Sequence, residues 1–284
     1  MSTEISYICI GHVCHDIVED GVILGGTASY SSIVSTRLGM NTGVVTSFGS
    51  DFEFVSRFEE KNIHLWVQES KETTSFRNIY KNGTRTQYMP TRAKTIGPET
   101  LPEFHKGIKA IQLCLISDEV DLNLLSALPS GIPIGATIQG WLRNFEKDGL
   151  VKAKLPNLKL FEHLELVFMS DDDIREVPQL LDQIIKIVPI VVLTRGKHGA
   201  DVYENGTKHT FPAYPSEEID PTGAGDVFST AFMISYSHNR NISRACSFAH
   251  CAASLSIEGM GVKSIPTREE VFERQILYFQ KFGE

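Results

Sequence analysis

Asp220-Pro221-Thr222-Gly223-Ala224-Gly225-Asp226 precedes an apolar run, 227–234, whose spacing predicts a helix buried nearly all round. Because Gly223 and Gly225 have no side chains, a ligand can approach their backbone N–H groups closely. A glycine turn that opens a helix leaves unpaired N–H groups at the positive end of the helix dipole, which favours an anion. With Asp226 beside it as a candidate base, the stretch suggests phosphoryl transfer to a hydroxyl. A plain turn before a core helix is the alternative interpretation of these residues alone.

The composition narrows the classes of protein. The 284 residues are 42% hydrophobic and 22% charged, which is typical of a globular chain with one large domain or two small ones. The net charge of −8 disfavours a nucleic-acid partner, because nucleic acids require a basic face. The five cysteines are odd in number and form no C-x-x-C pair, which disfavours a disulfide framework or structural zinc. Without a signal peptide or a membrane-spanning run, we expect a cytoplasmic protein with no membrane partner.

Buried strands and helices alternate along most of the chain. Apolar runs predict strands at 5–10, 42–48, 111–116, 132–138, 164–169 and 190–193. Helices are predicted at 30–38, 51–61, 121–128, from 170 onward, 242–257 and 267–279. Asn205-Gly206 predicts a hairpin between 201–204 and 208–211. This order is typical of an α/β fold, which we expect to form one domain over residues 1–284.

Residues 64–92 have a different character. The segments 65–67, 73–80 and 84–89 resemble strands, and Lys81-Asn82-Gly83 is a hairpin signal between the last two. Such an antiparallel patch predicts a small appended sheet, formed by about 12–24 and 64–92. It would act as a lid that shields a site from water. An exposed lid sheet would also be able to support a homodimer.

Polar residues and glycines follow several predicted strands, where α/β proteins bind ligands. Asp16 could accept two hydroxyl groups, or it is a turn or cap aspartate. Gly25-Gly26 stands before a helix and permits close backbone approach. Ser170 and Asp173 have the spacing of a helix cap, and the carboxylates 171–173 could also hold Mg²⁺ through water.

The order of these motifs resembles the ribokinase/PfkB family of carbohydrate kinases. The resemblance runs from Ile5 to about Pro266, and the 220–226 stretch is its most specific part, because it resembles the C-terminal signature of that family. It implies a ribokinase-like three-layer α/β/α sandwich with a small β-sheet lid, and ATP and Mg²⁺ as cofactors. The chain contains neither a G-x-x-x-x-G-K-[ST] loop nor a G-x-G-x-x-G after the first strand, which disfavours a P-loop kinase and a dinucleotide oxidoreductase.

The resemblance also implies a role for each matching residue. Asp226 would be the catalytic base, beside an anion hole of Gly223, Ala224 and Gly225. Asp16 would bind substrate hydroxyls, with Gly25 and Gly26 beside the substrate. Asp173 would match the acidic residue near the Mg²⁺–phosphate site. The implied nucleotide-binding residues are Ser170, Thr194, Gly196, Gly199 and His250.

Departures from the family pattern bear on the substrate. Ser29-Tyr30 stands where many members have an Asn, and Ser170 replaces the Asn that usually begins the acidic motif. Three segments, 11–16, 24–30 and 138–143, are more similar to the plant-type inositol kinases of the family.

We therefore expect the acceptor to be a small sugar, polyol or cyclitol. In this interpretation Arg143 faces the substrate or the phosphates, although a surface arginine after a strand fits the sequence equally well. The alternatives are a nucleoside or vitamin-precursor kinase and a non-catalytic regulator that binds a sugar or a nucleotide.

Overall fold

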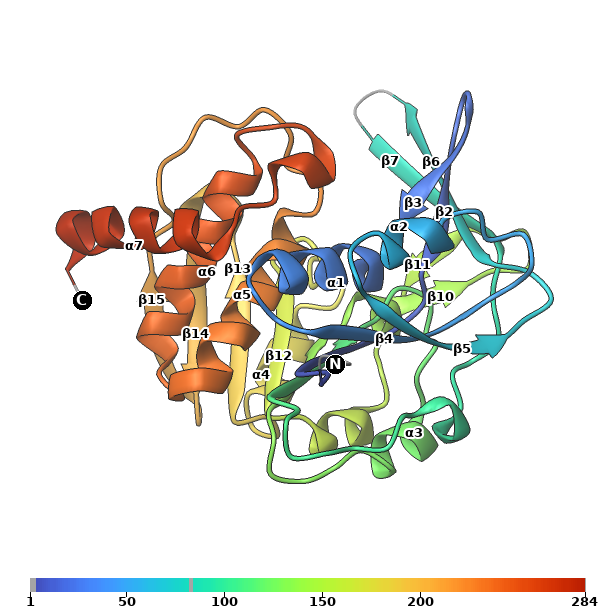
Figure 1. The fold of residues 1–284 in the computed structure, drawn as a ribbon, viewed down its shortest axis with the longest axis horizontal. Helices are drawn as coiled ribbons and strands as arrows, with labels where there is room; N and C mark the ends of the chain where they lie inside the picture. The colour runs from blue at the N-terminus through green and yellow to red at the C-terminus, as the bar shows by residue number, and fades with distance from the viewer. Residues whose placement is uncertain (1–3, 82–83, 284) are drawn as a thin grey trace.

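The computed structural model describes residues 4–81 and 84–283, and a nine-stranded mixed sheet forms its centre (Figure 1). The strand order is β15 (Thr207–Phe211), β14 (Ala200–Glu204), β13 (Ile190–Thr194), β12 (Leu166–Ser170), β9 (Ile134–Thr137), β8 (Ala110–Cys114), β1 (Tyr7–Ile10), β4 (Thr42–Phe48) and β5 (His64–Glu69). The strands from β5 to β13 are parallel, and β14 and β15 add an antiparallel hairpin at one edge. The hairpin predicted around Asn205-Gly206 is confirmed.

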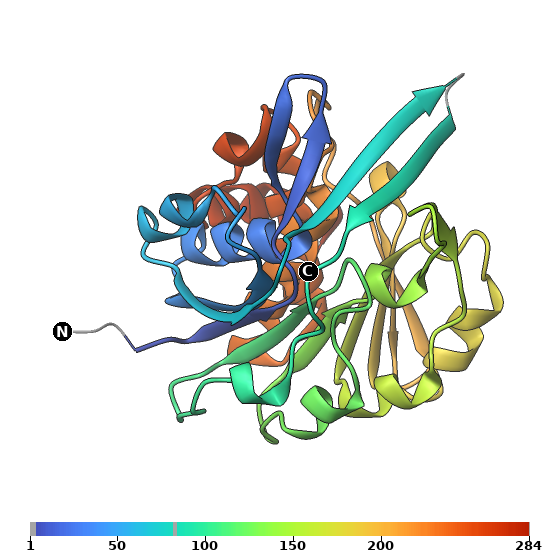
Figure 2. The same cartoon turned by 90° about the vertical axis from the view of Figure 1, so that its right-hand side faces the viewer.

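Helices cover both faces of the sheet (Figures 1 and 2). One face carries α1 (Thr27–Arg37), α2 (Val55–Glu59), α5 (Ala224–Asn239), α6 (Ile242–Ser256) and α7 (Arg268–Phe282). The other carries α3 (Leu122–Ser126), α4 (Gln179–Ile184) and the 3₁₀ helix η3 (Leu158–His163). Successive side chains of a strand point to opposite faces, so Tyr7 and Cys9 join the first core and Ile8 and Ile10 the second. The predicted three-layer α/β/α sandwich is confirmed.

A separate four-stranded sheet rises from one end of the molecule (Figure 2). Its order is β3 (Gly21–Gly25), β2 (Cys14–Val18), β6 (Thr74–Lys81) and β7 (Thr84–Thr91). The prediction that residues from 64 onward belong to this lid is wrong at its start, because β5 pairs in parallel with β4 in the main sheet. The ring of Trp66 covers Gly43 of β4, where a Cβ would lie 2.2 Å from it. The predicted turn at 81–83 falls on residues 82–83, outside the described residues.

The helix predicted from Ser170 onward is also wrong in its start. Residues 171–176 form turns, and α4 begins at Gln179. Pro178 explains the delay, because a proline disfavours helical backbone in the residue before it and suits the first positions of a helix. Two short strands that were not predicted, β10 (Arg143–Phe145) and β11 (Val151–Ala153), pack beside β7.

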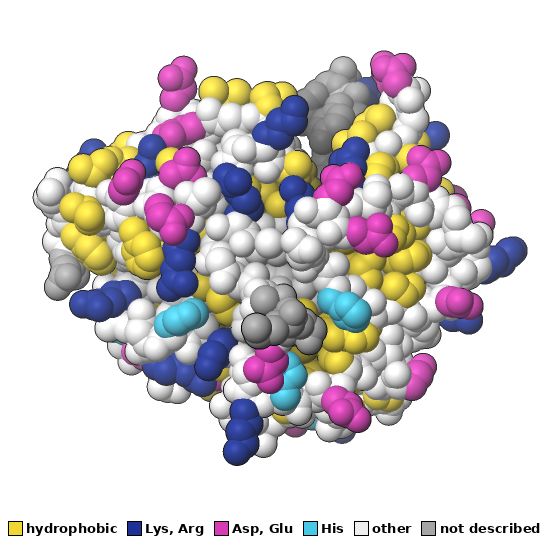
Figure 3. Space-filling view, in the orientation of Figure 1, with side chains coloured by type: hydrophobic (Ala, Val, Ile, Leu, Met, Phe, Trp, Pro, Cys, Tyr) yellow, Lys and Arg dark blue, Asp and Glu magenta, His cyan; other side chains and the backbone are white. Residues whose placement is uncertain are grey.

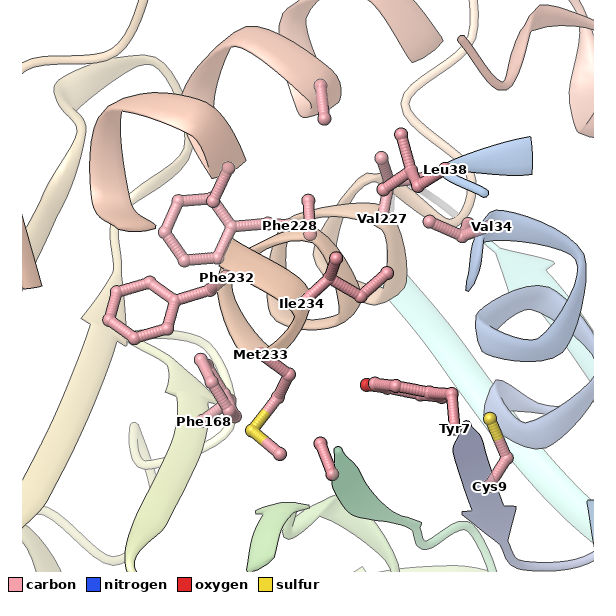
Figure 4. Packing of buried hydrophobic residues seen from close by; sticks show 14 of the residues in the cluster. Tyr7, Cys9, Val34, Leu38, Phe168, Val227, Phe228, Phe232, Met233 and Ile234 are labelled. Atoms are coloured by element: carbon pink, nitrogen blue, oxygen red, sulfur yellow. The ribbon is translucent and has the colours of Figure 1, made fainter. Parts of the chain in front are cut away.

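Helix α5 lies in the larger core, and Figure 4 shows its Val227, Phe228 and Phe232 among residues of α1, β1 and β12. A buried polar network also ties it to the sheet. The Tyr7 hydroxyl and the Thr230 hydroxyl donate to Gln112 Oε1 at 2.6 and 3.0 Å, and Gln112 Nε2 donates to Ser229 Oγ at 3.1 Å. Because every buried polar atom of this network has a partner, the position of α5 over the sheet is well determined. Across residues 4–81 and 84–283, no helix combines the length and apolarity needed to span a membrane.

Candidate active site

The start of α5 has donors for an anion. Gly223 is the N-cap with φ of 78°, a left-handed conformation that glycine adopts without strain, and it provides no side-chain cap. The N–H of Ala224 donates to the Pro221 carbonyl at 3.2 Å. The N–H groups of Gly225 and Asp226 belong to the first turn, which has no helical carbonyl to receive them. A Cβ at Gly225 would meet open space, so this end of the helix is accessible.

Asp220 fixes the turn before α5. Its two carboxylate oxygens accept the N–H groups of Thr222 and Gly261, each at 3.0 Å. These hydrogen bonds to the charged form lower the pKa of Asp220. The turn is thereby tied to the 3₁₀ helix η5 (Gly261–Ser264), whose first residue is 41 positions further along the chain. The first residue of the predicted stretch, Asp220, therefore holds the turn before α5 in place.

Asp226 has an altered acidity. Burial is the largest cause and raises its pKa to about 6, a hydrogen bond from Thr27 lowers it, and the negative Asp173 and positive Arg143 act in opposite directions. Near neutral pH the carboxylate is ionised but more basic than an exposed aspartate. This is the property that a general base requires.

The start of α1 is closed by protein atoms. A Cβ at Gly25 would lie 2.2 Å from Asp16 Oδ2, and one at Gly26, whose φ is 93°, would lie 2.8 Å from the His12 carbonyl oxygen. The sequence suggested that both glycines make room for a ligand. The structure shows that Gly25 makes room for the carboxylate of Asp16, which β2 brings over it from the lid.

Arg143 is a half-buried residue of the site and not a surface arginine. Its Nη1 donates to the Ile116 carbonyl at 2.8 Å, its Nη2 donates to Gln139 Oε1 at 2.5 Å, and its guanidinium lies 5.2 Å from the ring centroid of Phe76 in the lid. Gln139 Nε2 in turn donates to Asp173 Oδ1 at 3.1 Å. The charge of Arg143 is therefore held in one place and lowers the pKa of Asp226.

Ser170 and Asp173 make the predicted capping bonds although no helix starts there. Asp173 Oδ2 accepts from the backbone N–H and the hydroxyl of Ser170 at 2.9 and 2.8 Å, and the N–H of Asp173 donates back to Ser170 Oγ at 3.1 Å. Both oxygens of Asp173 thus already have donors. Among the described residues, no group of three or more His, Cys, Asp and Glu side chains is placed to hold a metal ion.

Two adjoining cavities meet at the start of α5. The first, about 600 Å³, is lined by Asp226, Gly225, Ser170, Asp173 and Thr194 among others. The second, about 560 Å³, is more apolar and is lined by Ala224, Gly225, Gly199, His250 and Ile257 among others. Thr194, Gly196 and Gly225 belong to both, so the two cavities form one continuous space on either side of the helix start.

His250 faces the second cavity as a neutral side chain. Burial lowers its pKa to about 3, and its ring lies 4.9 Å from that of Phe228 in an edge-on arrangement. In the part of the chain that is described, its Nε2 has no hydrogen-bond partner. Gly199 has a packing role too, because a Cβ there would lie 2.0 Å from the carbonyl oxygen of Phe211.

The structure thus brings the expected residues into two groups. The two cavities are lined by Ala224, Gly225, Asp226, Asp173 and the residues expected to bind a nucleotide, whereas Gly223 lines neither. Asp16, Gly25 and Gly26 lie at the start of α1, outside both linings, as does Arg143, whose charge lowers the pKa of Asp226. Sequence reasoning missed three residues that line the first cavity, Thr27, Gln139 and Lys197, and also Tyr30, which contacts Gly223. The sequence feature that could have identified these residues is their position, next to the glycine motifs or within segment 138–143.

Comparisons with known proteins agree with this geometry. Residues 18–268 match the model of the pfkB family of carbohydrate kinases. The chain is 22% identical to the nucleoside kinase of Methanocaldococcus jannaschii, over 88% of this chain and 84% of that protein. It is 26% identical to inositol 3-kinase of Arabidopsis thaliana, over 89% of this chain and 74% of that protein.

Among solved structures, a similar fold is found in a pyrophosphate-dependent kinase of the ribokinase family, complexed with a pyrophosphate analog and myo-inositol. The TM-score is 0.76 at 22% identity, over 94% of this chain and 99% of the other. The family match spans most of the chain, and both the fold and the predicted enzyme class, a phosphotransferase, are confirmed. The chain belongs to the PfkB family of carbohydrate kinases.

Proposed function

We propose that this protein transfers the terminal phosphoryl group of ATP to a hydroxyl of a small polyol or cyclitol. The observation that carries the proposal is the position of Asp226, a carboxylate with a pKa of about 6, in the first turn of α5 beside the N–H groups that would receive the phosphoryl group. A base and an anion site one residue apart allow deprotonation of an acceptor and stabilisation of the transferred group at the same point.

The chemical step follows from these positions. The acceptor hydroxyl gives its proton to Asp226, and its oxygen forms a bond to phosphorus as the bond to the leaving ADP breaks. The N–H groups of Gly225 and Asp226, at the positive end of the α5 dipole, stabilise the charge on the transferred oxygens. Because the N–H of Ala224 donates to Pro221, Ala224 contributes less to this anion hole than its two neighbours.

The second cavity supports a nucleotide as the donor. Pyrophosphate, on which the similar solved kinase depends, would need only the polar first cavity. Here a further cavity of about 560 Å³ adjoins it, with an apolar lining that includes the neutral side chain of His250. Apolar walls with a few polar groups are typical of a site for a base and its ribose.

The residues of the first cavity are compatible with Mg²⁺ held through water. Asp173 uses both oxygens for Ser170 and Gln139, so it suits an outer position, and Mg²⁺ commonly keeps several waters when it is bound with phosphates. Bound there, Mg²⁺ would supply charge neutralisation for the phosphates. Asp171 and Asp173 would orient its water ligands from the cavity wall.

The lid side supports a polyhydroxylated acceptor. The carboxylate of Asp16 can accept two hydroxyl groups, and Arg143 lies at the end of the Gln139–Asp173 network. Similarity to an inositol kinase over most of the chain favours a polyol or cyclitol. A nucleoside is the second candidate, because the similarity to a nucleoside kinase is of equal extent. A homodimer formed through the lid stays a prediction.

An acceptor screen tests the proposal. Purified protein with Mg²⁺ and either ATP or pyrophosphate would be assayed against inositols, pentoses, hexoses and nucleosides. We expect ATP to support turnover of an inositol or another polyol, and turnover of nucleosides alone, or with pyrophosphate alone, would contradict the proposal.

With the acceptor identified, Asp226→Asn should lower kcat by about 10²–10⁴. The control is Asp182→Asn, a residue of α4 that lies outside both cavities and should leave kcat unchanged. Turnover of Asp226→Asn within about tenfold of the wild type would contradict the assignment of the base.

A further inference from the structure

A third cavity, about 250 Å³, lies on the far side of Tyr30 from the first two. Its apolar wall includes Leu24 of the lid, and its charged wall consists of Arg57, Lys61 and Lys263 with a single carboxylate, Glu60. These residues come from the end of α2 and from η5, two segments that are distant in the sequence. Figure 3 shows Lys and Arg side chains over the upper middle of the molecule, with Asp and Glu side chains between and beside them.

The three cations are exposed side chains, and the carboxylate that lines the cavity beside them is Glu60. Among the described residues, neither Arg57 nor Lys61 nor Lys263 forms an ion pair, and Arg57 is instead stacked 4.9 Å from the ring centroid of Phe54. Arg57 belongs to α2, and Lys61 lies two residues beyond the end of that helix. The chain as a whole has a net charge of −8, so a cavity lined by three cations without ion pairs differs in sign from the rest of the protein.

Tyr30 forms a wall shared by this cavity and the start of α5. A Cβ at Gly223 would lie 2.6 Å from Tyr30 Cδ1, so the ring is in direct contact with the turn that opens the anion hole. Burial raises the pKa of Tyr30, and the next largest causes are the negative charges of Asp226 and Asp16. The ring therefore separates the basic cavity from the space between these two aspartates.

We propose that the cavity of Arg57, Lys61 and Lys263 binds an anionic group, a phosphate or a carboxylate, of a small molecule. Three cations against one carboxylate leave an excess of positive charge, and the apolar wall suits the few carbon atoms that such a group is attached to. The group belongs either to the acceptor itself, extended past Tyr30, or to a separate anion that steadies Tyr30 against Gly223. An anion that is part of the acceptor rests on the proposed phosphoryl transfer, whereas binding of a separate anion does not depend on it.

Thermal unfolding with inorganic phosphate tests the site without requiring turnover. The rise in Tm caused by phosphate over chloride, at matched ionic strength, would be measured for the wild type and for the triple variant Arg57→Gln, Lys61→Gln, Lys263→Gln. The matched control is Lys147→Gln, Lys159→Gln, Lys186→Gln, which removes three cations that lie outside all three cavities. We expect the rise to fall to less than half in the first variant and to persist in the control.

Phosphate bound at the start of α5 contributes equally to all three proteins, so the difference between variants reports the third cavity alone. An equal rise in the two triple variants would overturn the proposal. If the loss of Arg57 from Phe54 prevents folding, the double variant Lys61→Gln, Lys263→Gln keeps that contact and should still lose a measurable part of the rise.

A pentose and its 5-phosphate separate the two sources of the anion. If the anion is part of the acceptor, the pentose phosphate should raise Tm by more than pentose and inorganic phosphate added together, and the excess should vanish in the triple variant. If the anion is separate, inorganic phosphate should give the full rise with the neutral pentose present. A rise with pentose phosphate that is the same in both triple variants would overturn the proposal.

Discussion

Helices α1 and α5 begin with the same kind of turn, but the surroundings of the two turns differ. Each has a glycine N-cap with positive φ, 93° at Gly26 and 78° at Gly223, and neither has a side-chain cap. The two helices pack against each other, and their first turns meet where Thr27 bonds to Asp226 and Tyr30 covers Gly223. At Gly26 the surrounding atoms are protein, whereas at Gly225 the space is open.

The difference shows that a glycine turn before a helix indicates that other atoms come close to the backbone there. It does not indicate whether those atoms belong to the protein or to a ligand. In α1 the approaching atoms are the His12 carbonyl and the carboxylate of Asp16. The turn therefore packs against protein and fixes the positions of Thr27 and Tyr30. In α5 the ring of Tyr30 approaches Gly223, whereas a Cβ at Gly225 would meet none of the described atoms within 4 Å. Substitutions at and between the two helix starts should therefore have separable effects on stability and on catalysis.

The largest effects should come from adding one methyl group to each turn. Gly225→Ala adds a Cβ in open space at ordinary φ, so the fold should hold while kcat falls by about tenfold or more, since the methyl group enters the anion hole. Gly26→Ala forces a left-handed alanine against the His12 carbonyl and should cost at least about 2 kcal/mol of unfolding free energy. Urea unfolding and steady-state kinetics of both variants check this.

The proposed difference between the two helix starts would be contradicted if the Gly225→Ala protein were as unstable as the Gly26→Ala protein. It would also be contradicted if Gly225→Ala left kcat unchanged. The control is Gly206→Ala, at a hairpin turn with positive φ and open surroundings, far from both helix starts. It should lose some stability through its backbone conformation alone and keep its kcat.

A smaller effect should follow from cutting the link between the two helix starts. Thr27→Val removes the hydrogen bond that lowers the pKa of Asp226, so that pKa should rise. Because the base acts in its ionised form, the acid limb of the kcat profile, expected near pH 6 in the wild type, should move to higher pH. Thr137→Val is a matched control in the same cavity, because the Thr137 hydroxyl donates to the Leu113 carbonyl. If the acid limb of the kcat profile moves equally in both variants, the hydrogen bond from Thr27 does not set the pKa of Asp226.

The smallest effect concerns stability and has a definite sign with pH. The pKa of Asp226 is raised in the folded state, from 3.8 to about 6, so its ionisation opposes folding, and the cost is present above pH 6 and absent below pH 3.8. Asp226→Asn should therefore be more stable than the wild type at pH 8, by at most about 3 kcal/mol for a shift of this size, with no such gain at pH 3.5. Denaturant unfolding at the two pH values measures it, and a gain that does not vary with pH would refute the ionisation of buried Asp226 as its cause.

Much of the framework could be predicted because local patterns specify it. Continuous apolar runs identified the central parallel strands, and β4 has the predicted bounds. The start of the lid and the start of α4 could not be predicted in the same way. Whether 64–69 joins the lid or the main sheet depends on which strand Trp66 covers, a contact with Gly43 that no local pattern contains.

The site divides along the same line. The sequence allowed 220–226 and the loop after β13 to be proposed as parts of the site, because their glycines and carboxylates lie next to one another. A possible anion hole depends on only a few adjacent residues, so a local pattern can indicate it. Arg143, Thr27 and Tyr30 could not be assigned, because their partners Ile116, Asp226 and Gly223 lie far from them in sequence.

By itself, the sequence determined the α/β architecture, the helix that begins at the glycine turn and the family, since each depends on the spacing and type of neighbouring residues. The tertiary structure alone decided that Gly25 and Gly26 receive protein atoms, that the charge of Arg143 acts on Asp226 and that three cations line one cavity beside Tyr30. The physical reason is that burial, pKa and the free space beside a backbone depend on which distant segments pack together.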